Sequence, residues 1–219
     1  MNFRKPEDYL REEYFALLPR IRDAAEELEA EVRYLLVPIL RGKEPYERVV
    51  VKSRIKECDS AIASLQRRQE GGGFQGARPE SVSLRSLNDL AGVRILAFPR
   101  YRILEIDEAI RARFSNWMAD PVPAMPGTTE FLALKYHGYC SHGCQVRAEI
   151  QLMSMLVGLF WEVEHAAVYK PSLKMRGVEI ALRMQQQSTD VIRSMSAFEA
   201  GFESIVNETS RPGRLVIAD

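Results

Sequence analysis

Residues 87–98 read LNDLAGVRILAF, an almost continuous apolar run of strand length. Such a run predicts a buried strand, because few polar side chains are present to face water. Pro99 ends the run, and the apolar residues that follow, Ile103, Ile106 and Ile110, have helical spacing. A buried strand followed by an amphipathic helix indicates a sheet with helices packed against it.

Periodic apolar residues predict further helices on both sides of this segment. A 3.6-residue period predicts an N-terminal helix over 6–40 and a C-terminal helical region over 172–207. Residues 155–168 predict a mostly apolar helix between them.

Further strands are predicted by β-branched or alternating apolar segments, at 49–51, 131–136 and 144–152. The first of these is expected to turn helical at 53–56, and prolines indicate a loop at 120–127. Helices and strands thus alternate irregularly. We therefore expect residues 1–219 to form a single α+β domain with a mixed sheet.

The charge of the chain is balanced overall but uneven along its length. Lys and Arg (30) equal Asp and Glu (30), so there is no net field to attract a polyanion. Residues 41–102, however, hold 13 basic and 7 acidic residues, a local excess of +6. This segment is the place to look for a phosphate ligand, although a solvated basic helix face gives the same count.

Several features predict a cytoplasmic protein with no membrane span. The N-terminal residues are charged where a secretory signal needs an apolar core, and three cysteines cannot all pair within one chain. The longest apolar runs, 35–40 and 155–161, are far below the roughly 18 residues that a membrane helix needs.

Cations gather around the predicted strand-to-helix junction near residue 53. They are accompanied by a hydroxyl, and the set is Lys52, Arg54, Lys56, Ser60, Arg67 and Arg68. Such a cluster suits a polyphosphate, because Arg donates two parallel hydrogen bonds to phosphate oxygens and a helix N-terminus adds partial positive charge.

Two carboxylates stand on or beside predicted strands. Asp89 precedes the apolar run that contains Arg94, while Glu149 and Gln151 are two residues apart and therefore face the same side of their strand. Asp89 and Glu149 on neighbouring strands would suit Mg²⁺ bound to nucleotide phosphates. The alternative is that Asp89 is a cap or turn residue.

Three motifs, VVVKSRIKECDSAI, LNDLAGVRIL and AEIQLMSMLVGLFWEVEHAAVYK, in this order and spacing resemble the synthetase domain of the RelA/SpoT family. The resemblance covers residues 46–170. It implies a nucleotidyltransferase-like fold, with a mixed, mostly antiparallel sheet flanked by helices. It also implies a pyrophosphokinase that transfers pyrophosphate from ATP to the 3′-hydroxyl of a guanine nucleotide, giving ppGpp or pppGpp.

The resemblance assigns roles on the ATP side of the site. Arg54 and Arg94 would enclose the adenine, and Lys56 and Ser60 would bind the phosphates. Where the family has a Lys four residues after this serine, the chain has Ser64. The arginines that follow, Arg67 and Arg68, would have to reach the phosphates instead.

The resemblance also implies a magnesium cofactor. Asp89 would hold Mg²⁺, and Glu149 would either share the ion or act as general base on the attacking hydroxyl. Other matching positions would frame the site: Gln151, Glu164, His165, Tyr169 and Lys170.

The acceptor side departs from the family pattern. The Tyr-x-Ser-x-His motif, whose Tyr stacks on the guanine, has no clean counterpart, and Tyr136 and Tyr139 are the candidate stacking residues. The acceptor could be GDP or GTP, an adenine nucleotide giving ppApp, or the 3′-CCA end of tRNA, as in a toxin with an antitoxin partner. A catalytically inactive nucleotide-binding regulatory module is a further alternative function. A homo-oligomer is compatible with any of these functions.

Four soft metal ligands, His137, Cys140, His142 and Cys144, crowd the same turn. Their spacing is not that of a standard zinc knuckle, and a tight hairpin rarely lets four such side chains converge. We therefore favour a loop with incidental thiols over a metal site.

Overall fold

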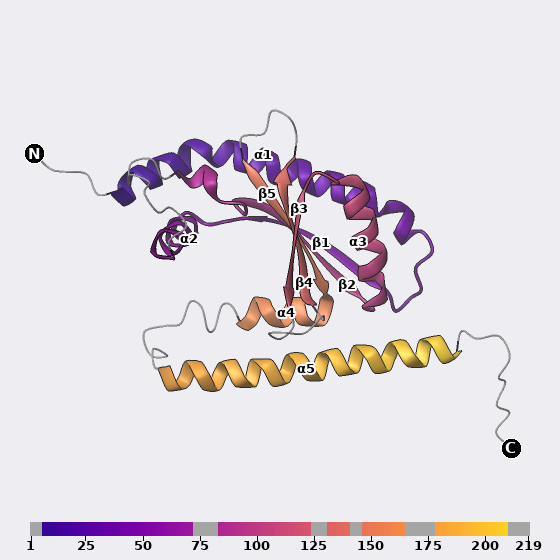
Figure 1. Ribbon diagram of the computed structural model, residues 1–219. Helices are drawn as coiled ribbons and strands as arrows, with labels where there is room; N and C mark the ends of the chain where they lie inside the picture. Colours follow the sequence, from indigo (N-terminus) through magenta and orange to yellow (C-terminus); the bar gives the residue numbers. More distant parts are fainter. Residues whose placement is uncertain (1–5, 72–82, 124–130, 141–145, 165–177, 210–219) are drawn as a thin grey trace, which may run out of the picture.

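The computed structural model describes residues 6–71, 83–123, 131–140, 146–164 and 178–209. Within them, helices lie around one sheet (Figure 1). The helices are α1 (Pro6–Leu40), α2 (Cys58–Glu70), the short 3-10 helix η2 (Leu84–Ser86), α3 (Tyr101–Arg113), α4 (Met155–Glu164) and α5 (Val178–Thr209). None of the helices described is long and apolar enough to cross a membrane.

Five strands of the described chain form the sheet, in the order β1-β2-β5-β4-β3. The β2–β5 pair is parallel, and the other neighbours are antiparallel. The strands are β1 (Arg48–Ile55), β2 (Ala91–Phe98), β3 (Met118–Pro123), β4 (Phe131–Tyr139) and β5 (Arg147–Ser154). The predicted mixed, mostly antiparallel sheet is therefore confirmed.

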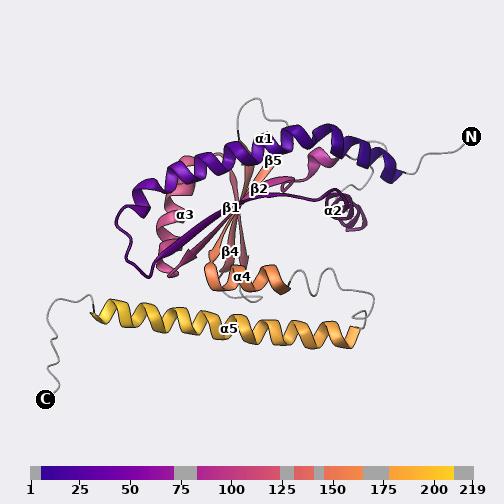
Figure 2. The ribbon, with the colours of Figure 1, turned by 180° about the vertical axis from the view of Figure 1, so that it is seen from behind.

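Helices α1 and α3 cover one face of the sheet, as the views from the front and from behind show (Figures 1 and 2). The side chains of β2 and β5 that point to this face are buried apolar residues, among them Val93, Ile95, Ile150 and Leu152. Helix α1 contributes its periodic apolar stripe to the same core, including the fully buried Leu28.

Helix α4 packs against the opposite face, but only at one end of the strands. Gly158 of α4 lies so close to β2 and β5 that an added Cβ would meet the side chains of Leu96 and Met153 at 2.3 and 3.0 Å. Around this contact Leu96, Met153 and Ala133 form a small second core. The other end of this face is left to polar side chains.

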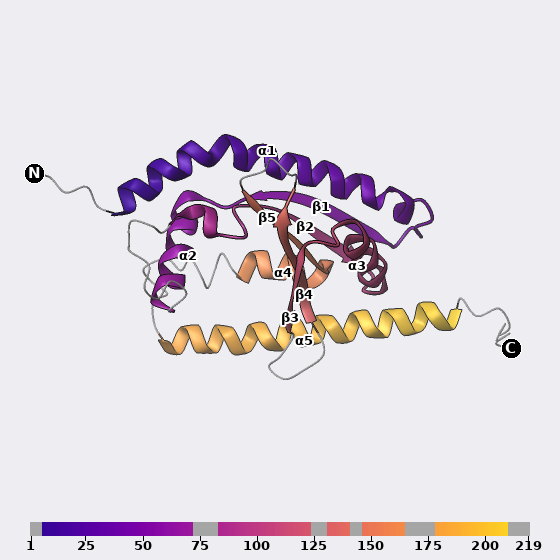
Figure 3. The same cartoon turned by 45° about the horizontal axis from the view of Figure 1, so that its top comes forward.

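Helix α5 runs outside α4, on the side of the molecule away from α1 (Figure 3). Its Phe202 packs against Tyr46 and Phe98. The Ser154 hydroxyl at the end of β5 donates to Glu199 of α5 at 2.5 Å. These contacts tie the C-terminal helix to the end of the sheet that α4 covers.

Two predictions of local structure are wrong. Residues 53–56 were expected to begin a helix, but β1 continues to Ile55 because it pairs with β2 along its whole length. Residues 120–123 were expected to be loop, but they belong to β3. Pro121 and Pro123 fit there because β3 is an edge strand with one side free of ladder hydrogen bonds.

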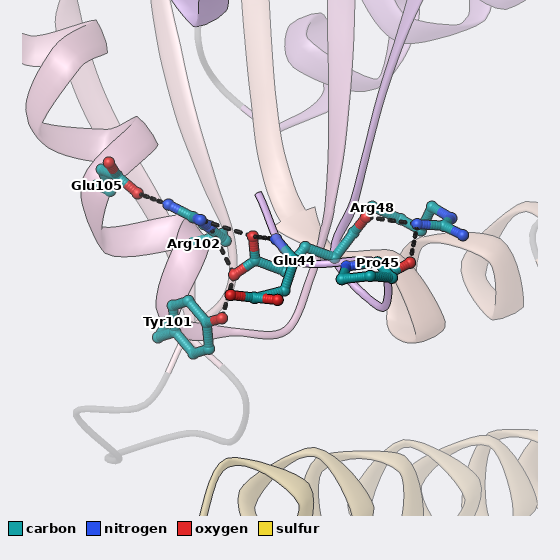
Figure 4. Close-up of polar contacts among 7 residues, drawn as sticks. Glu44, Pro45, Arg48, Tyr101, Arg102 and Glu105 are labelled. Atoms are coloured by element: carbon teal, nitrogen blue, oxygen red, sulfur yellow. Dashed lines mark hydrogen bonds and ion pairs between the residues drawn. The ribbon is translucent and has the colours of Figure 1, made fainter. Parts of the chain in front are cut away.

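A polar network joins the start of β1 to the start of α3 (Figure 4). Glu47, only 1% exposed, accepts hydrogen bonds from Arg102 and from the hydroxyl of Tyr101. The backbone N–H of Glu44 also donates to Glu47 Oε2, at 2.8 Å. Burial by itself raises the pKa of Glu47, but these hydrogen bonds hold it below its ordinary value.

Candidate active site

Two rows of polar side chains cross the half of the sheet that α4 leaves open. The strand register places Arg54, Gly92, Glu149 and His137 opposite one another in the first row. In the second row it places Lys52, Arg94, Gln151 and Lys135 opposite one another. Because the rows are two residues apart on every strand, all these side chains point to the same face.

Gly92 keeps the middle of the first row free of a side chain. An added Cβ would lie 2.8 Å from the backbone oxygen of Glu149, closer than real Cβ atoms come. The glycine therefore lets β2 and β5 approach closely and places no side chain between Arg54 and Glu149.

The second row is held by hydrogen bonds. Arg94 Nε donates to Gln151 Oε1 at 3.0 Å, and Gln151 Nε2 donates to Glu149 Oε1. From α4, Glu162 Oε1 lies 3.3 Å from Arg94 Nη1, and Glu162 Oε2 lies 3.2 Å from Lys52 Nζ. The rows thus form one connected polar surface with α4 as its border.

Glu149 is the most buried carboxylate on this surface, with 5% of the residue exposed. Its Oε2 lies 3.7 Å from His137 Nδ1 and 3.8 Å from Lys135 Nζ. His137 Nδ1 is itself buried and makes no hydrogen bond within the described part of the chain. Glu149 Oε2 therefore faces the Lys135 ammonium and the His137 ring, both at distances longer than a hydrogen bond.

Lys56 and Asp89 form a partly buried ion pair at the corner where β1 ends and β2 begins. Lys56 Nζ lies 2.5 Å from Asp89 Oδ2. The backbone N–H of Lys56 donates to Leu90 at 2.9 Å, and its carbonyl accepts from the Tyr14 hydroxyl at 2.7 Å. The pair is thus anchored both to β2 and to helix α1.

The charge around Asp89 favours its ionised form. Burial by itself raises its pKa, but the Lys56 ammonium, together with Arg54 and Arg68, holds the pKa below its ordinary value. Asp89 Oδ1 is buried and has no hydrogen-bond partner among the described residues. An unpartnered carboxylate oxygen of this kind fits a hard cation such as Mg²⁺.

The described residues contain no group of three or more His, Cys, Asp or Glu side chains that could hold a metal. A cation at Asp89 would therefore need phosphate and water oxygens to complete its shell, as is usual for Mg²⁺ bound with a nucleotide.

Helix α2, which begins just after Lys56, carries the remaining predicted phosphate ligands. Ser60 lies in its first turn, just after Lys56. Arg68 donates to the carbonyl of Ser86 at 3.1 Å, and Arg67 donates to Ser64 at 3.3 Å. The charge of Arg68, but not that of Arg67, is among the groups that act on Asp89.

The two tyrosines predicted for the acceptor side lie on opposite faces. Tyr136 pairs with Ile150, is 2% exposed, and donates its hydroxyl to Asp107 of α3. It is a core residue on the α1 and α3 side, so the expectation that it could stack on an acceptor base is corrected here. Tyr139 is 47% exposed and lies on the Glu149 face, with Arg147 5.4 Å from its ring centre.

The other predicted residues lie at the end of α4 or outside the described part of the chain. Glu164 ends α4, and His165, Tyr169 and Lys170 lie outside the described residues. Of the four soft ligands in the turn, His142 and Cys144 also lie outside them. Cys140 contacts the Ala24 carbonyl of α1 at 3.5 Å, on the far side of the sheet from His137.

Sequence reasoning missed three residues of this surface, Gly92, Lys135 and Glu162, and considered His137 only as a soft metal ligand. Gly92 had a visible signal, since it is the glycine of an otherwise apolar run. Lys135 and His137 could have been found from the two-residue period once β4 was paired with β5. Glu162 had no local signal, because its role depends on where α4 lies.

No family model matches the chain, and no curated protein matches its sequence. Its fold, however, is similar to that of solved structures. Small alarmone synthetase 1 from Bacillus subtilis, bound to its product pppGpp, has 18% sequence identity and a TM-score of 0.67. That match covers 91% of this chain and 100% of the other.

Two further structures show the same likeness. The same Bacillus subtilis protein bound to AMPCPP has 18% identity and a TM-score of 0.60, over 90% of this chain and 99% of that one. A GTP pyrophosphokinase family protein from Streptococcus pneumoniae has 17% identity and a TM-score of 0.60, over 90% and 96%. At these identities the matches establish the fold, and they confirm the predicted α+β class.

Proposed function

We propose that this protein is a pyrophosphokinase of the RelA/SpoT family, which transfers pyrophosphate from ATP to the 3′-hydroxyl of a purine nucleotide. The observation that carries the proposal is the position of Glu149, a nearly buried carboxylate on the same sheet face as Arg54 and Arg94. Cations suit a polyphosphate, and a buried carboxylate beside them can take a proton from a hydroxyl. The fold of small alarmone synthetases supports the same conclusion.

On the donor side, Arg54 and Arg94 would enclose the adenine, because planar guanidinium groups stack on a base. The two side chains are close enough for the charge of Arg54 to lower the pKa of Arg94, after the larger effect of burial. Lys56, Ser60 and Arg68 would bind the phosphates at the start of α2, whose N-terminus adds partial positive charge.

The reaction would proceed by attack of the acceptor 3′-oxygen on the β-phosphorus of ATP. The bond between the α,β-bridging oxygen and the β-phosphorus breaks, and AMP leaves. Glu149 would accept the proton of the attacking hydroxyl, while Lys135 and His137 stand beside its Oε2. Gln151 holds the other oxygen and so orients the carboxylate.

The residue that would hold Mg²⁺ is Asp89, whose Oδ1 is unpartnered among the described residues, and Glu149 would share the ion as the alternative to its role as base. The ion would neutralise charge on the transferring phosphates. Lys56 would keep Asp89 ionised whether or not the ion is bound.

On the acceptor side, the exposed ring of Tyr139 is the candidate for stacking on the base. Arg147 stands over this ring and also donates to Asn88 at 2.8 Å, next in sequence to Asp89. The acceptor side and the cation corner are therefore adjoining parts of one surface.

The test is incubation with ATP labelled on the γ-phosphate and a panel of acceptors: GDP, GTP, adenine nucleotides and tRNA. We expect label on a free purine nucleotide. Glu149→Gln should reduce turnover by about 100-fold or more. Glu208→Gln, which alters an exposed carboxylate of α5, is the matched control and should behave like the native protein.

Each alternative predicts a different result. Label on tRNA alone would contradict the proposal of an alarmone synthetase and support the alternative of a toxin that blocks translation. Nucleotide binding without transfer to any acceptor would identify an inactive binding module. Near-native turnover of Glu149→Gln would show that Glu149 is not the base.

A further inference from the structure

Glu162 of α4 links two cations that stand opposite each other on β1 and β2. Its Oε1 lies 3.3 Å from Arg94 Nη1, and its two oxygens lie 3.3 and 3.2 Å from Lys52 Nζ. Lys52 and Arg94 are a cross-strand pair. The carboxylate is thus the point at which α4 contacts the polar half of the sheet face.

The contact continues across the sheet to the candidate base. Arg94 has only donors, so the Gln151 oxygen must face Arg94 Nε, and the Gln151 amide nitrogen must face Glu149. A chain of side-chain hydrogen bonds therefore runs from Glu162 through Arg94 and Gln151 to Glu149. Each member limits the rotation of the next.

Glu162 also compensates a repulsion. Arg54 and Arg94 are both permanently charged and lie on neighbouring strands of the same face. Burial and the charge of Arg54 lower the pKa of Arg94, and Glu162 opposes both effects. Without this carboxylate, Arg94 would tend to turn away from Arg54, and the pair could no longer flank one base.

We propose that Glu162 is a positioning residue of the nucleotide site, which holds Arg94 beside Arg54 and, through Gln151, orients Glu149. The inference rests on the proposed function for the identity of the nucleotide. It predicts a coupled effect, because one side chain supports both the group that binds the donor base and the group that accepts the proton.

The experiment compares the native protein with Glu162→Ala, Glu162→Gln and a control. Asp190→Asn is the matched control. Like Glu162, Asp190 pairs with an arginine, Arg193 at 3.3 Å, but this ion pair is exposed and lies on α5. Steady-state rates would be measured while ATP and acceptor are varied separately. AMPCPP affinity by calorimetry and the thermal midpoint would be recorded for every variant.

For Glu162→Ala we expect kcat to fall and KM for ATP to rise, so that kcat/KM for ATP falls about tenfold or more. KM for the acceptor should stay unchanged, and AMPCPP should bind more weakly. Glu162→Gln keeps an oxygen for Arg94 Nη1 but not the charge that offsets Arg54, so it should recover only part of the loss. Asp190→Asn should match the native protein. Partial unfolding alone would lower kcat without this selective change in KM.

The outcomes separate this inference from the proposed function. An active native protein whose Glu162→Ala variant keeps kcat/KM for ATP and AMPCPP affinity within twofold would overturn the role of Glu162 only. Higher activity in Glu162→Ala would also overturn it, since Glu162 would then be competing with the substrate. A native protein that neither binds AMPCPP nor transfers label would overturn both.

Discussion

Gly92 lies directly opposite Glu149 in the parallel pairing of β2 with β5, and a Cβ at Gly92 would come within 2.8 Å of the Glu149 carbonyl oxygen. The obstacle is backbone rather than a flexible side chain, so it can be relieved only by moving a strand. The absence of a side chain at this position thus allows the close approach of β2 and β5 beside the candidate base.

Gly92→Ala should therefore damage both stability and activity. Forcing β2 and β5 apart should cost about 1–3 kcal/mol of unfolding free energy and reduce turnover. Gly201→Ala on α5 is the control: nothing lies within 4 Å of its added Cβ, and the helix should gain about 0.5–1 kcal/mol. Urea unfolding and initial rates measure both effects. A Gly92→Ala protein of native stability and rate would contradict the close approach.

Changes at the two tyrosines of β4 should have different effects, one on stability and the other on binding of the acceptor. Tyr136→Phe removes a buried hydroxyl that donates to Asp107 and should cost about 1–3 kcal/mol of stability while turnover at low temperature stays near native. Tyr139→Ala should leave the thermal midpoint nearly unchanged and raise KM for the acceptor. If Tyr136→Phe instead has native stability, the buried hydrogen bond to Asp107 contributes nothing and the placement of Tyr136 in the core is wrong.

The Glu47 network should make stability depend on pH. Folding lowers the pKa of Glu47 below its ordinary 4.5, so its contribution is present above that value and is lost as pH falls through the lower, folded pKa. Glu47→Gln should be less stable than the native protein near neutral pH by about 1–3 kcal/mol. This difference in unfolding free energy between the two proteins should narrow as pH falls. Urea titrations from about pH 7 to about pH 3 measure it. A difference that stays constant would exclude this linkage.

The Lys56–Asp89 pair should show strong coupling in a double-mutant cycle. Lys56→Met leaves the partly buried Asp89 without its nearest cation, so the pKa of Asp89 should rise. Lys56→Met and Asp89→Asn together should therefore cost less than the sum of the single changes, by about 1 kcal/mol or more. Chemical unfolding of the four proteins tests this, and additive costs would show that the pair contributes little.

Local sequence pattern was enough to locate most of the elements. The apolar period of α1, the buried run of β2 and the alternation in β5 each depend on residues within one segment. The structure has all three elements, although β2 begins at Ala91 rather than at residue 87 and β5 is Arg147–Ser154 rather than 144–152. The errors lie where pairing overrides local preference. Residues 53–55 extend β1 because β2 pairs with them, and prolines are accepted in β3 because it is an edge strand.

The candidate site divides in the same way. Arg54, Asp89, Arg94 and Glu149 could be named from chemistry and motif spacing, because each residue type carries its own signal. Which face a side chain occupies depends on register, and a difference of one position separates the buried Tyr136 from the polar His137. The position of Glu162 depends on how α4 packs through Gly158 against Leu96 of β2, a segment far from α4 in the chain. Such placement follows from the whole packed structure, since no local pattern specifies which distant groups will meet.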